Sequence, residues 1–257
     1  MAILAFHNVD DTFPLGVNYY PPNRLRNLLI HLRNSGYTFL PLNEYLKLDC
    51  NQNAISLTFD DGYRTFYEKV WPLLSEHSVP AAIFMPLNWV GKSNNWDYMS
   101  LLRESAHLNR AQLRGLASNN IEIGSHGLNH KSLAGISDRI LRVELEHSRK
   151  GLEDIIGRPV RYLSYPFGRY DERTERFALQ AGYERGFSLS YFSKGRQGFT
   201  LPRHSIYYFD SPFSVMQKIE RCPLNHLEKI KGAIINSYSY GTILLNKIRP
   251  QRLLRKP

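Results

Sequence analysis

Two acidic side chains stand together at the end of an apolar run. In residues 55–62 the run ends in Asp60, Asp61 and Gly62. Its β-forming residues predict a buried strand, and the glycine marks a sharp exit from it. Side chains alternate between faces along a strand, so both carboxylates can reach one site only where the backbone bends. Buried carboxylates need a compensating cation, and a metal ion is the simplest one. A surface Asp-Asp-Gly turn is the alternative.

Two histidines supply further metal-ligand chemistry. His126 and His130 follow an apolar run at 121–124, spaced about one helical turn apart. Two histidines and one carboxylate, with water in an open position, form a known catalytic zinc arrangement. The chain holds nine histidines, so the pair alone carries little weight. Taken with Asp61, it favours a metal site.

Short apolar runs alternate with helical patterns about seven times, which predicts parallel strands joined by crossover helices. A (β/α) barrel and an open doubly wound sheet are the two candidates. The predicted strands are 2–6, 37–40, 55–59, 80–85, 121–124, 162–165 and 183–189. Helices are expected near 25–35, 43–48, 63–77, 98–105, 110–117, 138–156 and 171–181. Pro72 should bend the third of these or mark a new first turn.

The residues that could do chemistry follow the carboxyl ends of the predicted strands. His7 follows the first, and Pro166-Phe167-Gly168 follows the sixth. Arg203 and His204 lie beyond the seventh. Active sites of parallel α/β folds form at this end of the sheet. The joint pattern therefore predicts one site rather than scattered surface residues.

Composition bounds the partners. The 257 residues are 42% hydrophobic and carry a net charge of +10, which favours anionic partners. A nucleic-acid-binding motif is absent from the sequence, so no nucleic acid partner is expected. No signal peptide or transmembrane run is seen, which predicts a cytoplasmic location. If the C-terminal residues 211–257 bind a membrane, the location would be at its inner face. Residues 238–245 are apolar and aromatic and precede a basic cluster, a pattern that suits peripheral membrane contact. A packed helix with a solvated tail is the alternative.

The blocks at 58–62, 125–130 and 164–168 together resemble the polysaccharide deacetylases of the NodB-homology type, carbohydrate esterase family 4. The resemblance runs from about residue 7 to residue 206. It implies a distorted (β/α)7 barrel at 1–210. The residues beyond it, 211–257, are predicted from their own pattern to form a short helical, basic extension. The resemblance also implies that Asp60 is the general base and that Asp61, His126 and His130 hold one divalent metal ion. Zinc is expected first, with cobalt, nickel and iron open.

Two features depart from that family. The arginine that many members carry in the proline-containing block is missing, and Arg203 could supply its charge from elsewhere. The late Leu-x-His block is also missing. Poly-N-acetylglucosamine deacetylases use an early histidine instead, and His7 matches their pattern, with His204 as the rival general acid. Tyr165, Phe167 and Arg203 are expected around the oxyanion and substrate.

The implied activity is metal-dependent removal of N-acetyl groups from amino sugars in a glycan or glycan precursor. An O-acetyl esterase and a non-catalytic carbohydrate-binding relative are the alternatives. A glycoside hydrolase fits poorly, because its two catalytic acids should lie roughly 5–9 Å apart across a bond.

Overall fold

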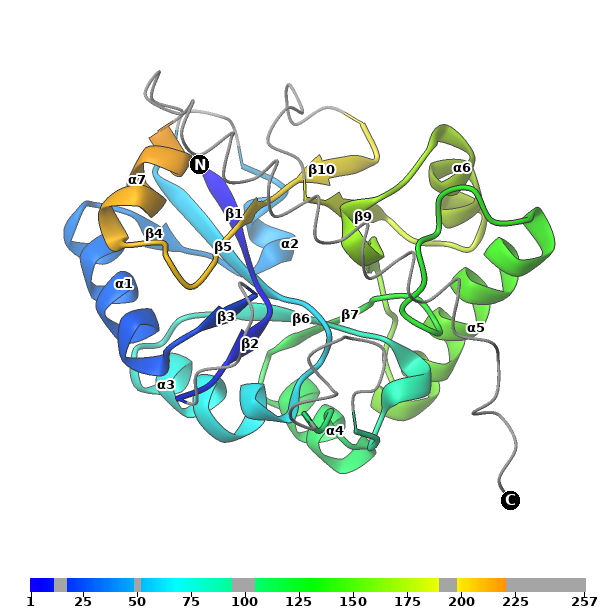
Figure 1. Cartoon of the computed structure of the whole chain (residues 1–257), viewed down its shortest axis with the longest axis horizontal. Helices are drawn as coiled ribbons and strands as arrows, with labels where there is room; N and C mark the ends of the chain where they lie inside the picture. Colours follow the sequence, from blue (N-terminus) through cyan, green and yellow to red (C-terminus); the bar gives the residue numbers. More distant parts are fainter. Residues whose placement is uncertain (12–17, 49–51, 94–104, 190–197, 221–257) are drawn as a thin grey trace.

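The computed structural model describes residues 1–11, 18–48, 52–93, 105–189 and 198–220. A parallel sheet curls into a barrel with helices outside it (Figure 1). The main-sheet strands are β1 (Ala2–Phe6), β4 (Thr38–Phe39), β5 (Ala54–Phe59), β6 (Ala81–Met85), β7 (Glu122–Ser125), β8 (Tyr162–Ser164), β9 (Arg185–Ser188), β10 (Thr200–Pro202) and β11 (His204–Ser205). β2 (Asn8–Val9) and β3 (Tyr19–Tyr20) form a separate parallel pair.

One strand closes the barrel in two halves. β10 pairs with β9, β11 pairs with β1, and only Arg203 separates the two halves along the chain. The sheet order is β10-β9-β8-β7-β6-β5-β1-β11, with β4 beside β5. Because the first and last members of this order are halves of one strand, the described strands form a ring of seven positions. The predicted distorted (β/α)7 barrel is confirmed.

Alternation along the strands separates two apolar cores. Ile55, Leu57 and Phe59 of β5 belong to the larger core between sheet and helices. The side chains of Thr58 and Asp60 point the other way, into the barrel. That interior also holds a smaller buried cluster, which includes Ile3, Ala82, Phe84, Tyr162, Phe187 and Leu201. Asp60 is therefore an inward-facing residue at the rim of a filled barrel.

The helices are α1 (Pro22–Asn34), α2 (Leu42–Tyr45), α3 (Trp71–Glu76), α4 (Arg110–Ser118), α5 (Asp138–Ile156), α6 (Glu172–Gln180) and α7 (Pro212–Glu220). The helical pattern at 63–77 becomes a π-helical turn, Phe66–Val70, followed by α3. Pro72 lies in the first turn of α3, where its missing N–H costs nothing, so it marks a new first turn, one of the two outcomes expected for it. Most of the helix expected at 98–105 falls outside the described residues.

The last described helix packs on the barrel. Val215 and Ile219 of α7 join the larger core, and Lys218 Nζ lies 2.5 Å from Asp210 Oδ2. Both of these charged side chains are buried. Residues 221–257, with the apolar run and basic cluster expected to contact a membrane, lie outside the described residues. Among the residues described, no helix is both long enough and apolar enough to span a membrane.

Candidate active site

Three expected metal ligands converge at the carboxyl ends of β5 and β7. One ligand atom each from Asp61, His126 and His130 lies within 4.8 Å of the others, and all three residues are buried. Asp61 Oδ1 is 3.4 Å from His126 Nε2 and 3.0 Å from His130 Nε2. Asp61 itself adopts a left-handed backbone with φ of 68°, as does Gly62. The bend therefore begins one residue before the glycine and brings both carboxylates to one site.

The donor set fits a divalent cation. His126 Nδ1 lies 2.8 Å from the backbone oxygen of Ser164, and as the donor there it leaves the Nε2 lone pair facing Asp61. Such an outer hydrogen bond fixes the ring orientation of metal-binding histidines. Burial lowers the pKa of His126, but the charges of Asp60 and Asp61 outweigh it and raise the pKa overall. The cluster thus already attracts positive charge, as a site for a dication should.

Asp60 does not join the ligand cluster but is held by Arg203. Arg203 donates to both carboxylate oxygens of Asp60, at 2.8 and 2.7 Å, and the same guanidinium reaches Ser164 Oγ at 2.7 Å and Thr58 Oγ1 at 3.1 Å. Ser164 Oγ also donates to Asp60, at 3.1 Å. Arg203 is only 2% exposed. The sequence predicted that Arg203 supplies the charge of the missing arginine, near the oxyanion and substrate. Its guanidinium fixes the Asp60 carboxylate, and a contact with substrate stays a prediction.

The charges around Asp60 and Asp61 keep both carboxyls ionised. Burial alone would raise the pKa of Asp60, but Arg203 first, then His126 and His7, hold it below its ordinary value. Burial likewise opposes ionisation of Asp61, yet His130, His126 and His7 bring its pKa well below the ordinary range. An ionised Asp60 beside a ligand cluster is the state that a general base needs.

His7, not His204, lies within electrostatic reach of the cluster. Its charge contributes to the pKa of Asp60, Asp61 and His130. Its Nδ1 is buried and has no hydrogen-bond partner among the described residues. His204 lies on β11 beside Leu4, one residue after the inward-pointing Arg203. Alternation along the strand therefore turns His204 toward the outside of the barrel.

A buried glutamate that sequence reasoning missed fixes the histidine loop. Glu144 of α5 is 2% exposed and accepts hydrogen bonds from Leu128 N at 2.8 Å, Asn129 N at 3.0 Å and Asn129 Nδ2 at 2.7 Å. These bonds hold the two residues just before His130. The sequence does carry a signal, because Glu144 interrupts the apolar face that Leu141, Leu145 and Leu152 form on this helix.

The proline-containing block divides between the site and the outer core. The Phe167 ring lies 5.0 Å from that of His130, and both residues have positive φ, 61° and 53°. Non-glycine residues in this region cost about 1–3 kcal/mol each and gather at functional sites. Tyr165 instead stacks on Tyr170 at 4.9 Å, with its hydroxyl 2.9 Å from Thr200 Oγ1. The Tyr165 side chain therefore lies in the larger core, and its expected part around the oxyanion and substrate stays a prediction.

One more buried histidine flanks the ligand cluster, with no motif to announce it. His107 is 2% exposed and stacks on Tyr63, with ring centroids 5.2 Å apart. Burial lowers its pKa to about 4, while Asp61 pulls in the opposite direction and His130 in the same one. His107 is therefore neutral at neutral pH, and it lies close enough to Asp61 and His130 for their charges to change its pKa.

Similarity to known proteins agrees with this geometry. Residues 47–186 match the family model described as polysaccharide deacetylase. A putative polysaccharide deacetylase, YxkH of Bacillus subtilis, is 29% identical over 191 residues, 72% of this chain and 63% of that protein. A poly-beta-1,6-N-acetyl-D-glucosamine N-deacetylase of Staphylococcus aureus is 27% identical over 165 residues, 62% of this chain and 57% of that protein. The chain thus spans about three fifths of the length of these relatives.

Solved structures share the fold at low identity. The deacetylase PplD of Streptococcus pyogenes, solved with acetate, superposes with a TM-score of 0.72 at 21% identity, covering 85% of this chain and 97% of that one. IcaB of Ammonifex degensii gives 0.72 at 19% identity, covering 83% and 94%. The family model covers more than half of the 257 residues and includes the Asp60–Asp61 turn, the histidine loop and the proline-containing block. The chain is therefore a member of the polysaccharide deacetylase family.

Proposed function

We propose that this chain is a metal-dependent hydrolase that removes N-acetyl groups from the amino sugars of a glycan. The observation that carries the proposal is the convergence of Asp61, His126 and His130 beside an Asp60 carboxylate that Arg203 grips through both oxygens. The names of the Bacillus and Staphylococcus relatives support the same class of substrate. Because the chain spans only part of those proteins, the activity is proposed from its own residues.

Each of these residues has a distinct part in that reaction. A divalent cation held by Asp61, His126 and His130, zinc first, would supply Lewis-acid activation of water and of the acyl carbonyl. Asp60 accepts the proton of the attacking water, since its lowered pKa leaves it ionised and Arg203 fixes its direction. The backbone N–H of Phe167 is the proposed donor to the developing oxyanion.

The proposed acid separates amide from ester chemistry. An amine leaves only after it gains a proton, whereas an alcohol leaving group depends on that proton far less. His7 lies close enough to influence both Asp60 and Asp61, and it stands at the end of β1, on the rim of the barrel. Its position is what a proton donor to the departing amine requires, so the N-acetyl group is favoured over an O-acetyl ester.

Acetate release by the chelator-treated and remetallated protein tests the proposal. The panel pairs zinc, cobalt, nickel and iron with N-acetylated and O-acetylated glycans. Asp60→Asn should keep its metal but lose roughly 10²–10⁴-fold in turnover, the scale of a general base. His126→Ala should lose the metal itself. Full activity in Asp60→Asn, or wild-type metal content in His126→Ala, would contradict the assignment of these roles.

A further inference from the structure

A lysine and an aspartate are buried together where α7 packs on the closing strand. Lys218 and Asp210 have side chains 1% and 3% exposed, and their charged atoms lie 2.5 Å apart. Desolvation offsets much of the attraction in a buried ion pair, so stability alone does not account for this one. Neither residue belongs to the set assigned above to the metal or to the reaction.

The pair holds the backbone of the closing strand just past Arg203. Lys218 Nζ donates to the Ser205 backbone oxygen at 3.0 Å. Asp210 Oδ2 accepts the Tyr207 backbone N–H at 2.8 Å. The two charged side chains therefore fix the strand at two points, which lie two and four residues beyond Arg203.

The Ser205 carbonyl lies on the side of β11 that faces away from β1. The N–H of Arg203 donates to Ser188 of β9 at 3.0 Å, and the N–H of Ile206 donates to β1 at 2.8 Å. Backbone groups alternate in direction along a strand, so the Ser205 carbonyl points to the side of β9. β9 ends at Ser188, and among the described strands β11 pairs with β1 alone. Lys218 thus supplies the donor that this buried carbonyl needs.

Arg203 reaches Asp60 only in the present register of the closing strand. Its guanidinium points into the barrel and donates both hydrogen bonds to the Asp60 carboxylate. A slip of one residue along the strand would turn every side chain to the other face and bring His204 to the inside. The bond from Lys218 to Ser205 opposes such a slip, because it fixes one carbonyl of the strand to a helix outside the barrel.

α7 is itself fixed to the barrel, so the lysine has a firm support. Val215 and Ile219 pack in the larger core, and Ser214 Oγ donates to Asp210 Oδ1 at 3.2 Å. The family model matches residues 47–186, so α7 and its contacts with β11 lie outside the matched range. A role of this helix at the site is therefore specific to what the structure of this chain shows.

We propose that Lys218 is a positioning residue for the general base. Its bond to Ser205 and its pair with Asp210 fix the register of β11. That register directs the guanidinium of Arg203 onto the Asp60 carboxylate. The proposal rests on the proposed deacetylase function only for the role of Asp60 as the base. By this proposal α7 belongs to the working barrel rather than to an extension beyond it.

Proton exchange in the metal-free protein tests the positioning apart from any chemistry. Nuclear magnetic resonance follows the guanidinium N–H groups of Arg203, which burial and the bonds to Asp60 protect from exchange with water. Lys218→Met should speed their exchange at least about tenfold, the scale of one lost hydrogen bond to a charged group. The amides of β6 should keep their protection, since the change is local. Lys218→Met with Asp210→Asn removes both buried charges and should give the same result if the single variant does not fold.

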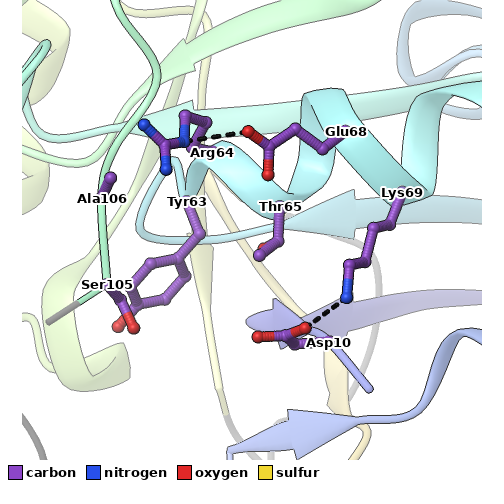
Figure 2. A pocket seen from close by; sticks show the side chains of 8 residues that line it. All are labelled: Asp10, Tyr63, Arg64, Thr65, Glu68, Lys69, Ser105 and Ala106. Carbon is purple, nitrogen blue, oxygen red and sulfur yellow. Dashed lines mark hydrogen bonds and ion pairs between the residues drawn. The ribbon is translucent and has the colours of Figure 1, made fainter. Parts of the chain in front are cut away.

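A more exposed lysine–aspartate pair gives the matched control. Lys69 lies 2.5 Å from Asp10, with side chains 30% and 10% exposed, and Figure 2 shows this pair from close by. Lys69→Met should leave the exchange of the Arg203 guanidinium unchanged. Three results would overturn the positioning role: faster Arg203 exchange in Lys69→Met as well, unchanged exchange in the Lys218 variants, or an equal loss of protection throughout β6.

Acetate release distinguishes this proposal from the preceding one. In the metal-loaded protein Lys218→Met should lower kcat at least about tenfold with KM and metal content unchanged, and it should add no further loss in an Arg203→Lys background. If Arg203 exchange responds as predicted but no metal restores acetate release, the deacetylase function fails and the positioning role stands. If Lys218→Met matches the wild type in both acetate release and Arg203 exchange, the function stands and the positioning role is refuted.

Discussion

Replacing Arg203 by methionine should expose how strongly the barrel depends on the pair that Arg203 forms with Asp60. The substitution leaves a carboxylate that is 1% exposed without the two N–H donors at 2.8 and 2.7 Å. Removing one partner of a buried ion pair costs about 3–5 kcal/mol, because the other charge stays buried and uncompensated. Typical domains are stable by only about 5–15 kcal/mol.

The second substitution makes the prediction quantitative. Asp60→Asn with Arg203→Met removes both buried charges, so the double variant should be far less destabilised than the sum of the two single variants. We expect a coupling free energy of about 2–3 kcal/mol, near the upper end for contacting residues. The assay is urea unfolding at pH 7 with a chelator present, so that metal affinity does not enter the measured free energy.

A surface pair supplies the scale for comparison. Arg161 and Glu122 lie 3.1 Å apart, with side chains 35% and 18% exposed. A double-mutant cycle on such a pair should give a coupling free energy of less than about 1 kcal/mol. Arg203→Lys should keep the positive charge but lose the pair of hydrogen bonds to the two Asp60 oxygens. The turnover rate should therefore fall by a larger factor than the folding equilibrium constant. A coupling at the Arg203–Asp60 pair no larger than that of the surface pair would refute the reasoning.

Three further changes have defined outcomes. Glu144→Gln should weaken metal affinity about 10–100-fold by calorimetry, since it loosens the loop before His130, whereas Glu146→Gln, two residues further along α5, should not. Asp171→Ala should cost about 1 kcal/mol at pH 7 by losing the cap of α6. Burial would raise the pKa of Asp171, but hydrogen bonds to its carboxylate outweigh burial and lower the pKa. The stabilisation is therefore present above about pH 4 and disappears as the pH falls through the folded-state pKa. The prediction is contradicted if the stability difference between wild type and variant does not change with pH. Gly168→Ala should destabilise by roughly 1–3 kcal/mol and slow acetate release, because φ is 67° and a Cβ would meet Leu189 N at 2.7 Å; unchanged unfolding curves would count against this.

The strand and helix pattern left a barrel and an open sheet as candidates, and the resemblance to the deacetylases selected the barrel. The gathering of Asp61, His126 and His130 could be expected because it depends on local patterns. Residues 55–62 and 121–130 each show an apolar strand followed by acidic or histidine side chains. The carboxyl ends of parallel strands lie at one edge of the sheet, so these side chains come together. The confirmed α5, Asp138–Ile156, shows how well a long periodic segment with a glycine stop can be assigned. The contact of Arg203 with Asp60 was beyond such patterns.

What could not be predicted depends on contacts between distant residues. The pairing of β10 and β11 with different neighbours is non-local, so Arg203 looked like a residue past the sheet rather than one inside it. Glu144 reaches its loop only after α5 packs on the barrel. Tyr165 was expected at the site because its block is, but alternation beside the inward-facing Ser164 turns it outward.

The divided closing strand is also the last ring position along the chain. The other six ring positions precede it in the chain, so Asp61, His126 and His130 are all synthesised before residue 203. Until then Asp60 lacks its cationic partner. The base role proposed for Asp60 therefore depends on the docking of residues 200–205, the last part of the barrel to be synthesised.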